Sequence, residues 1–200
     1  MSRSDTGRPY HHGDLRQATI DEAVRVIAEE GPGALSLRDL ARRLGVSHAA
    51  PTHHFGDKAG LLTAVAAEGY RLLAAELRRA YERTGDFLEV GVAYVRFATR
   101  NRPYFDVMFR PELYHDDDPE LTQARKESAS MLYGPVSERP GAAGDGRQVV
   151  EAGVAAWSLV HGLATLYLNG NIPANLGKDP ERIARSVAGY LFGPGDGRRH

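Results

Sequence analysis

Two pairs of adjacent histidines are the first candidates for metal-binding or catalytic residues in this 200-residue chain. His11 with His12, and His53 with His54, could offer imidazole nitrogens to a metal ion, as in a helical metal-dependent enzyme. Adjacent side chains on a helix point about 100° apart, however, and helical zinc sites use spacings of three or four residues. The sequence also lacks cysteine, which excludes disulfides, thiolate metal sites and cysteine nucleophiles. We therefore predict no metal, no cofactor and no enzymatic activity.

A different chemistry is indicated by residues 37–47, whose spacing fits a helix-turn-helix. Two helices can cross steeply when the residue at the crossing is small and the turn accepts a positive φ. Ala41 supplies the small residue, and Gly45, four residues later, supplies the turn. Ser47 can then cap a third helix, whose exposed start is free to meet DNA bases or phosphates. An ordinary helical hairpin would use the same alanine and glycine, so this pattern alone leaves both interpretations open.

Hydrophobic periodicity is helical over nearly the whole chain and predicts an all-α protein. The first helix, at residues 14–30, should end at the helix-breaking Gly-Pro-Gly sequence that follows it. Ser36, with Asp39 three residues later, is typical of a capping box. The segment 114–119 contains three consecutive aspartates and should be a solvated loop. Further helices are expected at residues 36–45, 47–55, 58–84, 86–100, 120–136, 147–168 and 180–192, with a short aromatic helix or turn at 104–110.

The net charge and the hydropathy of the chain do not by themselves indicate whether it binds DNA or a membrane. Residues 1–58 hold eight basic and eight acidic residues, so a basic DNA-binding surface must come from their placement rather than their sum. Five of the eight histidines lie in this segment, and histidine can add positive charge near neutral pH. No apolar run approaches the roughly 20 residues of a membrane span, and the polar start is unlike a secretory signal. We expect no membrane association and a cytoplasmic location.

The segment from Gly45 to Lys58, with Leu61 and Leu62 after it, resembles the signature of the TetR (tetracycline-repressor) family. Its Gly-Val-Ser, its His-Phe and its final lysine fall at the family's spacing, and the resemblance covers residues 14–83. It implies an N-terminal domain that binds double-stranded DNA and an all-helical C-terminal domain. It also implies a transcriptional regulator, here a repressor released from its operator by a small, largely apolar effector.

This resemblance implies a division of the chain into domains. We expect a flexible arm at 1–13, a helix-turn-helix domain at 14–57, an effector-binding and dimerisation domain at 58–193, and a disordered tail at 194–200. Residues 58–84 would form the connecting helix. In the family the last two long helices, here about 147–169 and 180–192, form a homodimer interface, which suits a palindromic operator. Trp157, His161 and Gly162 look like the tryptophan–histidine–glycine motif of one TetR subgroup.

The resemblance also predicts DNA contacts residue by residue. Lys58 lies at the positive end of a helix dipole and should contact phosphate. Ala49 and Ala50 could pack on thymine methyl groups, or could simply favour the helix. The predicted DNA-binding residues are Ser36, Arg38, Ser47, His48, Ala49, Ala50, Thr52, His53, His54 and Lys58.

Two residues depart from the family pattern. Thr52 stands where relatives usually have a tyrosine that touches phosphate, and threonine has a shorter reach. Pro51 stands where leucine is common, and it should forgo one helical hydrogen bond. Together with the neutral charge balance, Thr52 leaves an alternative, a ligand-sensing interaction module with impaired DNA binding.

Aromatic side chains in the second half of the chain suggest an apolar effector cavity with a few polar groups, the usual composition of a ligand site. Core packing is the competing interpretation for each of them. The predicted effector-binding residues are Tyr94, Phe97, Tyr104, Phe105, Met108, Phe109, Trp157 and His161.

Overall fold

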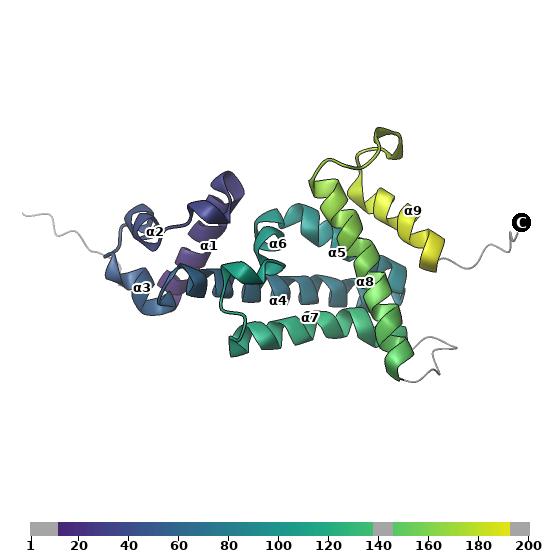
Figure 1. Cartoon of the computed structure of the whole chain (residues 1–200), viewed down its shortest axis with the longest axis horizontal. Coiled ribbons are helices and arrows are strands. Elements are labelled where there is room, and N and C mark those ends of the chain that lie inside the picture. The colour runs from purple at the N-terminus through teal and green to yellow at the C-terminus, as the bar shows by residue number, and fades with distance from the viewer. Residues whose placement is uncertain (1–11, 138–145, 193–200) are drawn as a thin grey trace, which may run out of the picture.

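The computed structural model describes residues 12–137 and 146–192, and every regular element in these ranges is a helix (Figure 1). The all-α prediction is therefore confirmed. Most of the expected arm, residues 1–11, and the whole expected tail at 194–200 lie outside the described residues.

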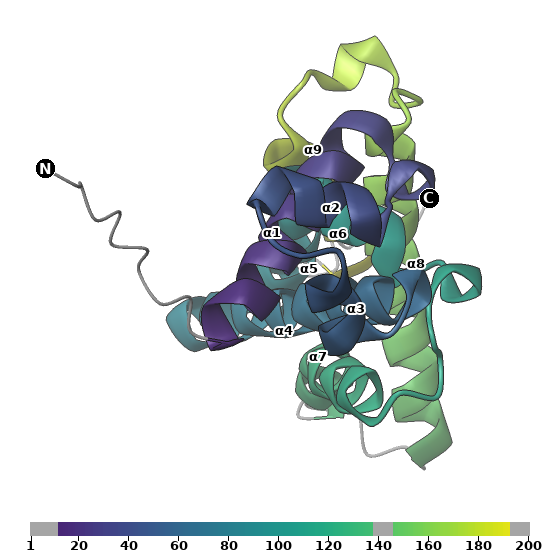
Figure 2. The same ribbon diagram turned by 90° about the vertical axis from the view of Figure 1, so that its left-hand side faces the viewer.

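A small helical bundle forms the N-terminal end of the molecule (Figures 1 and 2). It consists of α1 (His12–Glu30), the 3₁₀ turn η1 (Pro32–Ala34), α2 (Leu37–Leu44) and α3 (Ala49–Phe55). Ala41 is completely buried, and α2 ends at Gly45 in the left-handed conformation with φ 67°. A side chain at Gly45 would be strained in this conformation. The small residue and the turn glycine therefore have the roles that their spacing predicted.

Helix α4 (Lys58–Thr84) runs from this bundle into the second half of the molecule. Its first backbone N–H groups need acceptors outside the helix, and the Asp57 carboxylate accepts from the N–H of Gly60 at 2.8 Å. The segment 61–67 is buried on every side of the helix. The predicted bounds of this helix and its aspartate cap are confirmed.

The remaining helices surround the far part of α4 (Figure 1). Helix α7 runs alongside α4, and α8 crosses the end of this pair away from the N-terminal bundle. Helix α9 packs on α5. The elements are α5 (Phe87–Arg100), α6 (Arg102–Met108), η2 (Pro111–Leu113), α7 (Pro119–Ser137), α8 (Gly146–Leu168), η3 (Ala174–Leu176) and α9 (Pro180–Phe192).

Two predicted helix caps differ from the structure. Ser36 makes no side-chain cap hydrogen bond, and the Asp39 carboxylate accepts from Arg42 and Arg43 rather than completing a capping box. Helix α3 begins at Ala49, and Ser47 contributes its backbone carbonyl, which accepts from the N–H of Ala50 at 3.0 Å. The positions of both helices were predicted correctly to within two residues, although their capping chemistry was not.

One expectation about hydropathy was wrong. The 22-residue stretch Arg147–Leu168 in α8 is long and apolar enough to cross a membrane by length and composition, with a hydropathy of 1.4 over its most apolar window. Only 28% of that window is buried. A single helix of this kind is weak support for a membrane span, because core helices of soluble proteins meet the same criteria. Helix α8 does leave an apolar face uncovered.

The joint between α3 and α4 has no room for a side chain at Gly60. A Cβ atom there would lie 2.0 Å from the Phe55 carbonyl oxygen. We therefore expect Gly60→Ala to lower the free energy of unfolding by about 1–3 kcal/mol, the usual cost of overpacking. Urea denaturation followed by circular dichroism measures this.

Gly33→Ala is the matched control, because no atom lies within 4 Å of its added Cβ. Its change should stay within about 1 kcal/mol. Equal stability of the Gly60 variant and wild type would contradict the tight α3–α4 joint.

Candidate DNA interface and effector cavity

The outer face of α3 exposes most of the residues predicted to meet DNA. Ser47, His48, Ala49, Thr52 and His53 are exposed, and Ala50 is half-buried. Figure 2 shows α2 and α3 on the side of the molecule that faces the viewer there. These side chains lie together on one surface and are free to contact a partner.

Pro51 lies on the buried side of α3, opposite this exposed face. It is buried, and it occupies the third position of α3, in the first turn. Backbone N–H groups in the first turn of a helix have no intrahelical partner, so the proline costs little there. The expected loss of a helical hydrogen bond is thus avoided by where the helix begins.

The cations of α2 differ in how they are neutralised. Arg42 and Arg43 both bond Asp39, and Arg43 also reaches Glu22 at 3.5 Å and Glu30 at 3.4 Å. Hydrogen bonds from Arg42 and then Arg43 hold the pKa of the Asp39 carboxyl below its usual value.

Arg38, by contrast, is exposed and has no ion-pair partner among the described residues. A surface hollow of about 440 Å³ lies at this place, between the starts of α2 and α3. Arg38 can therefore offer its whole charge to an anion. The hollow is lined by Ser36, Arg38, Asp39, Arg42 and His48.

Two of the predicted contacts have partners inside the protein. The Lys58 ammonium donates to the Gly33 carbonyl at 2.7 Å and thereby ties the start of α4 to η1. His54 is half-buried and lines a hollow that also includes Arg16 and His115, on the side toward the second domain. Lys58 retains further N–H donors, whereas His54 lies apart from the outer face of α3.

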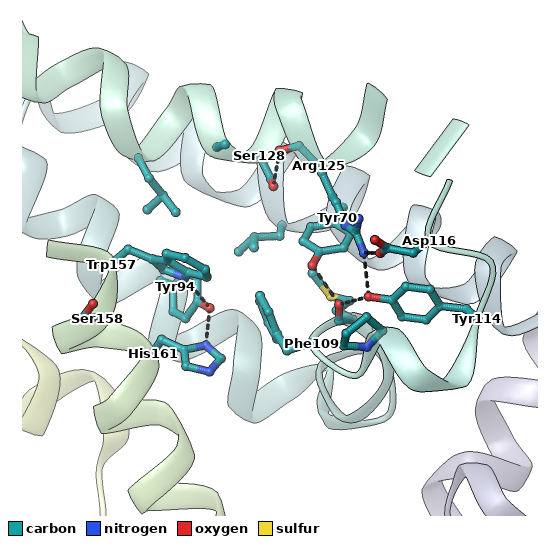
Figure 3. A pocket seen from close by; sticks show the side chains of 15 residues that line it. Tyr70, Tyr94, Phe109, Tyr114, Asp116, Arg125, Ser128, Trp157, Ser158 and His161 are labelled. Carbon is teal, nitrogen blue, oxygen red and sulfur yellow. Dashed lines mark hydrogen bonds and ion pairs between the residues drawn. The ribbon is translucent and has the colours of Figure 1, made fainter. Parts of the chain in front are cut away.

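A cavity of about 600 Å³ lies among α4, α5, α6, α7 and α8 (Figure 3). Polar groups gather at two places in it, one around Trp157 and one around Arg125, with Phe109 between them. Apart from Ser128 and Ser158, the rest of its lining is apolar. Its lining comprises Tyr70, Leu73, Tyr94, Met108, Phe109, Pro111, Tyr114, Asp116, Arg125, Ser128, Ala129, Leu132, Trp157, Ser158 and His161.

Five of the eight residues predicted for an effector site line this cavity, namely Tyr94, Met108, Phe109, Trp157 and His161. The other three lie outside it. Phe97 is a core residue of α5, and Phe105 lies behind the wall with its ring 5.1 Å from that of Phe109. Tyr104 lies at the junction of the two domains, where its hydroxyl donates to Glu68 of α4 at 2.7 Å and Glu68 also accepts from Gln17 of α1.

Trp157, Tyr94 and His161 form the first polar group. The Trp157 Nε1–H donates to the Tyr94 hydroxyl at 3.3 Å, and that hydroxyl lies 2.9 Å from Nδ1 of His161. Burial lowers the pKa of His161 and so favours the neutral ring. Tyr94 therefore accepts from the indole and donates its own proton to the imidazole Nδ1, which leaves the ring proton of His161 on Nε2.

The second polar group surrounds Arg125 of α7. The hydroxyls of Tyr70 and Tyr114 both donate to the Met108 carbonyl at 2.8 Å. Nη2 of Arg125 donates to the Tyr114 hydroxyl at 2.8 Å and to Asp116 at 2.6 Å. Burial raises the pKa of Tyr70 to about 12. Tyr114 is only 7% exposed, so the expectation that segment 114–119 is entirely a solvated loop was wrong at its first residue.

The sequence did not predict Arg125 as a cavity residue, because a charged residue in a mostly polar helix is usually exposed on the surface. Its spacing does contain a signal, since Leu121, Ser128 and Leu132 at intervals of three and four place Arg125 on the buried face of α7. Tyr70 has the same kind of signal, because the buried Leu73 and Leu77 follow it three and seven residues later on α4, whereas Tyr114 has none. The described residues contain no group of three or more His, Asp or Glu side chains placed to hold a metal ion.

Comparison with known families matches both halves of the chain. Residues 20–65 match the family of bacterial regulatory proteins called the tetR family. Residues 87–189, just over half of the chain, match the tetracyclin repressor-like C-terminal domain. The chain belongs to the TetR family.

Individual relatives agree with this assignment. A protein of unknown function from Rhodococcus sp. RHA1 has 33% identity, with 93% of this chain and 97% of that chain covered and a TM-score of 0.78. A regulator from Saccharomonospora viridis in complex with choline has 17% identity, coverage of 90% and 96% and a TM-score of 0.66, which shows the shared fold alone. The HTH-type transcriptional regulator BetI of Rhizobium meliloti is 45% identical over 49 residues. The chain spans about a quarter (24%) of the length of this curated relative, and the match covers 24% of the chain.

The neutral state of His161 predicts a pH-dependent stability. Since its pKa is lower in the folded protein than in the unfolded chain, the unfolded chain binds this proton first as the pH falls. The free energy of unfolding should therefore decrease from pH 7.5 to 5.5. His161→Asn, which keeps an acceptor for Tyr94, should lose less stability over this range. Urea denaturation of both proteins at both pH values measures it, and equal losses would contradict the buried neutral imidazole.

Proposed function

We propose that this protein is a sequence-specific DNA-binding transcriptional regulator, a repressor that a small effector releases from its operator. The observation that carries the proposal is the exposed outer face of α3 in a matched TetR helix-turn-helix. Residues 14–57 would form the helix-turn-helix DNA-binding domain, and residues 58–193 the effector-binding and dimerisation domain.

In the proposed complex, α3 lies in the major groove and the starts of α2 and α4 lie against phosphates. His48, Thr52 and His53 would reach base edges or phosphates from the exposed face of α3. Arg38 would bind phosphate with its unpaired guanidinium, and Lys58 with the N–H groups that Gly33 leaves free. The threonine at position 52 is exposed and can still donate a hydroxyl, although its reach is shorter than that of the family's tyrosine.

The uncovered face of α8 and α9 supports a homodimer through residues 147–169 and 180–192. Large apolar side chains on these two helices are 42–89% exposed, as expected for a surface that meets a partner. A second copy of the chain would cover them through a two-fold interface, which matches a palindromic operator. These residues are Val150, Val154, Leu166 and Tyr190.

The cavity of about 600 Å³ is the proposed effector site, and five of its lining residues were expected from the sequence. Trp157, His161 and Gly162, which lie within the matched residues 87–189, support the further proposal that the C-terminal domain belongs to the tryptophan–histidine–glycine subgroup. A regulator of this kind acts in the cytoplasm, bound to the nucleoid when on its operator, and neither enters a membrane nor catalyses a reaction.

The direct test is a gel-shift assay with DNA from the region upstream of the protein's own gene. The proposal predicts a retarded protein–DNA complex. Unlabelled random duplex of equal length should displace the labelled DNA at least about tenfold less effectively than unlabelled DNA of the same upstream sequence, and the affinity should fall as the salt concentration rises. Equal competition by random DNA at low salt would favour the alternative, an interaction module that senses a ligand without reading DNA.

Replacing the unpaired cation of α2 should weaken binding without sequence preference. Arg38→Ala removes one phosphate contact, so the log–log slope of affinity against salt should fall by about 1. Arg78→Ala, an exposed cation of α4 far from α2, is the control and should leave the slope unchanged. Fluorescence anisotropy with labelled operator measures both, and an unchanged slope for Arg38→Ala would remove this contact.

A charge on the α8 face should separate the protomers. Val154→Glu would bury a carboxylate in the proposed interface and raise the dimer dissociation constant at least about tenfold. Leu72→Glu, at a leucine of α4 that is 38% exposed, is the matched control. Sedimentation velocity distinguishes monomer from dimer. Dimers of unchanged strength in the Val154 variant would place the interface elsewhere.

A further inference from the structure

Among the described residues that line the cavity, only Arg125 has a permanently cationic side chain. Its hydrogen bonds to Tyr114 and Asp116 both leave from Nη2, so Nε and Nη1 retain donors for another acceptor. Its side chain is 30% exposed, which makes it accessible but partly removed from water. A planar guanidinium in such a place suits a carboxylate, which it can bind through two parallel hydrogen bonds.

The Asp116 carboxylate is the group that a ligand carboxylate could replace as the partner of Arg125. It lines the same cavity, and its side chain is 62% exposed. An ion pair this open to solvent is weak, because water competes for both charges. A ligand carboxylate can therefore replace the Asp116 carboxylate on Arg125 at small cost, while the ligand's apolar part gains burial against the cavity wall.

The arrangement of the aromatic rings disfavours a cationic ligand at this end. Arg125 itself lies over the rings of Tyr70 and Tyr114, at 5.7 and 5.4 Å from their centroids. These ring faces are the surfaces on which a ligand ammonium would bind, and the protein's own cation occupies them. A second positive charge there would also be repelled by Arg125.

The opposite end of the cavity is uncharged. His161 is neutral, and its tautomer leaves an N–H at Nε2 rather than a negative group. Phe109, Leu132 and Trp157 supply apolar surface. A complementary ligand therefore has an apolar body and one anionic end.

We propose that the effector is an amphipathic organic anion whose carboxylate binds Arg125 in place of Asp116, with its apolar body against Phe109, Leu132 and Trp157. This inference rests on the proposed function, because it names the ligand class of the proposed effector site.

The effect of carboxylate binding would be transmitted to the DNA-binding domain through the segment 114–118. His115, next to Asp116, donates its backbone N–H to the Thr63 hydroxyl at 3.0 Å, and its imidazole lies 3.2 Å from the Asp57 carboxylate. Asp57 caps α4 directly after α3, and Thr63 lies in the second turn of α4. Displacement of Asp116 from Arg125 loosens the support that this segment gives to the joint between α3 and α4.

The sole tryptophan of the chain makes the ligand class measurable, because Trp157 lines the cavity and its emission reports binding there. Two matched series serve as probes: octanoate, octanamide and octyltrimethylammonium, and 4-phenylbutyrate with its amide and trimethylammonium analogues. We expect a carboxylate to bind at least tenfold more tightly than its two analogues. Arg125→Met should abolish this preference, Arg125→Lys should keep part of it, and Lys126→Met, at an exposed neighbour on α7, should keep all of it.

Several results would overturn the proposal. These are an amide or ammonium that binds as tightly as its carboxylate, an Arg125→Met protein that is folded by circular dichroism and keeps the preference, and no change of Trp157 emission with any of the six compounds.

Operator affinity tests the coupling separately. A saturating carboxylate should weaken operator binding at least fivefold in wild type. Thr63→Val should still bind the carboxylate but show less release, since it lacks the acceptor for His115. A carboxylate that binds without affecting operator affinity overturns the coupling through segment 114–118. If the ligand-free protein binds no duplex, the proposed function fails, while the Trp157 titration still decides the ligand class.

Discussion

The complete burial of residues 61–67 in α4 is the constraint on which the rest of the molecule depends. A helix segment with no exposed face must be covered on every side, and here two groups of helices share that task. The N-terminal bundle covers the start of α4, whereas α5, α6 and α7 cover its middle and end. Neither group can shift without moving α4 or exposing apolar surface. A change in the cavity is therefore placed to alter the position of α3.

Polar contacts define how the two groups of helices meet around this buried helix. Glu68 of α4 accepts from Tyr104 of α6 and from Gln17 of α1, and so joins three helices from both domains. On the other side, the segment that carries His115 contacts Thr63 and Asp57. Each contact is modest because it is partly exposed, so these polar contacts oppose a movement of α4 only weakly. Such a joint suits a regulator that exchanges between two conformations.

The sequence predicted the helices well because their signals are local. Ala41, Gly45 and the Asp57 cap act within a few residues of themselves, and the structure has each in its expected role. The cavity could be predicted only in part, because its lining joins five helices and the segment between α6 and α7, which are distant in the chain. Phe105 and Phe97 show the difficulty, since an aromatic residue one helical turn from the cavity wall packs in the core instead. Tyr114, beside three aspartates, gave no local sign of burial.

The outer face of α3 and the cavity are linked, in this account, by one equilibrium between two positions of α4. Linkage then requires reciprocity, so DNA must change the affinity of the cavity for its ligand by the same factor by which the ligand changes DNA affinity. The most direct measurement is a titration of Trp157 emission with a bound carboxylate, performed with and without saturating operator duplex. This equilibrium predicts weaker carboxylate binding in the presence of operator, by a factor equal to the loss of operator affinity. The same ligand affinity with and without operator would contradict it.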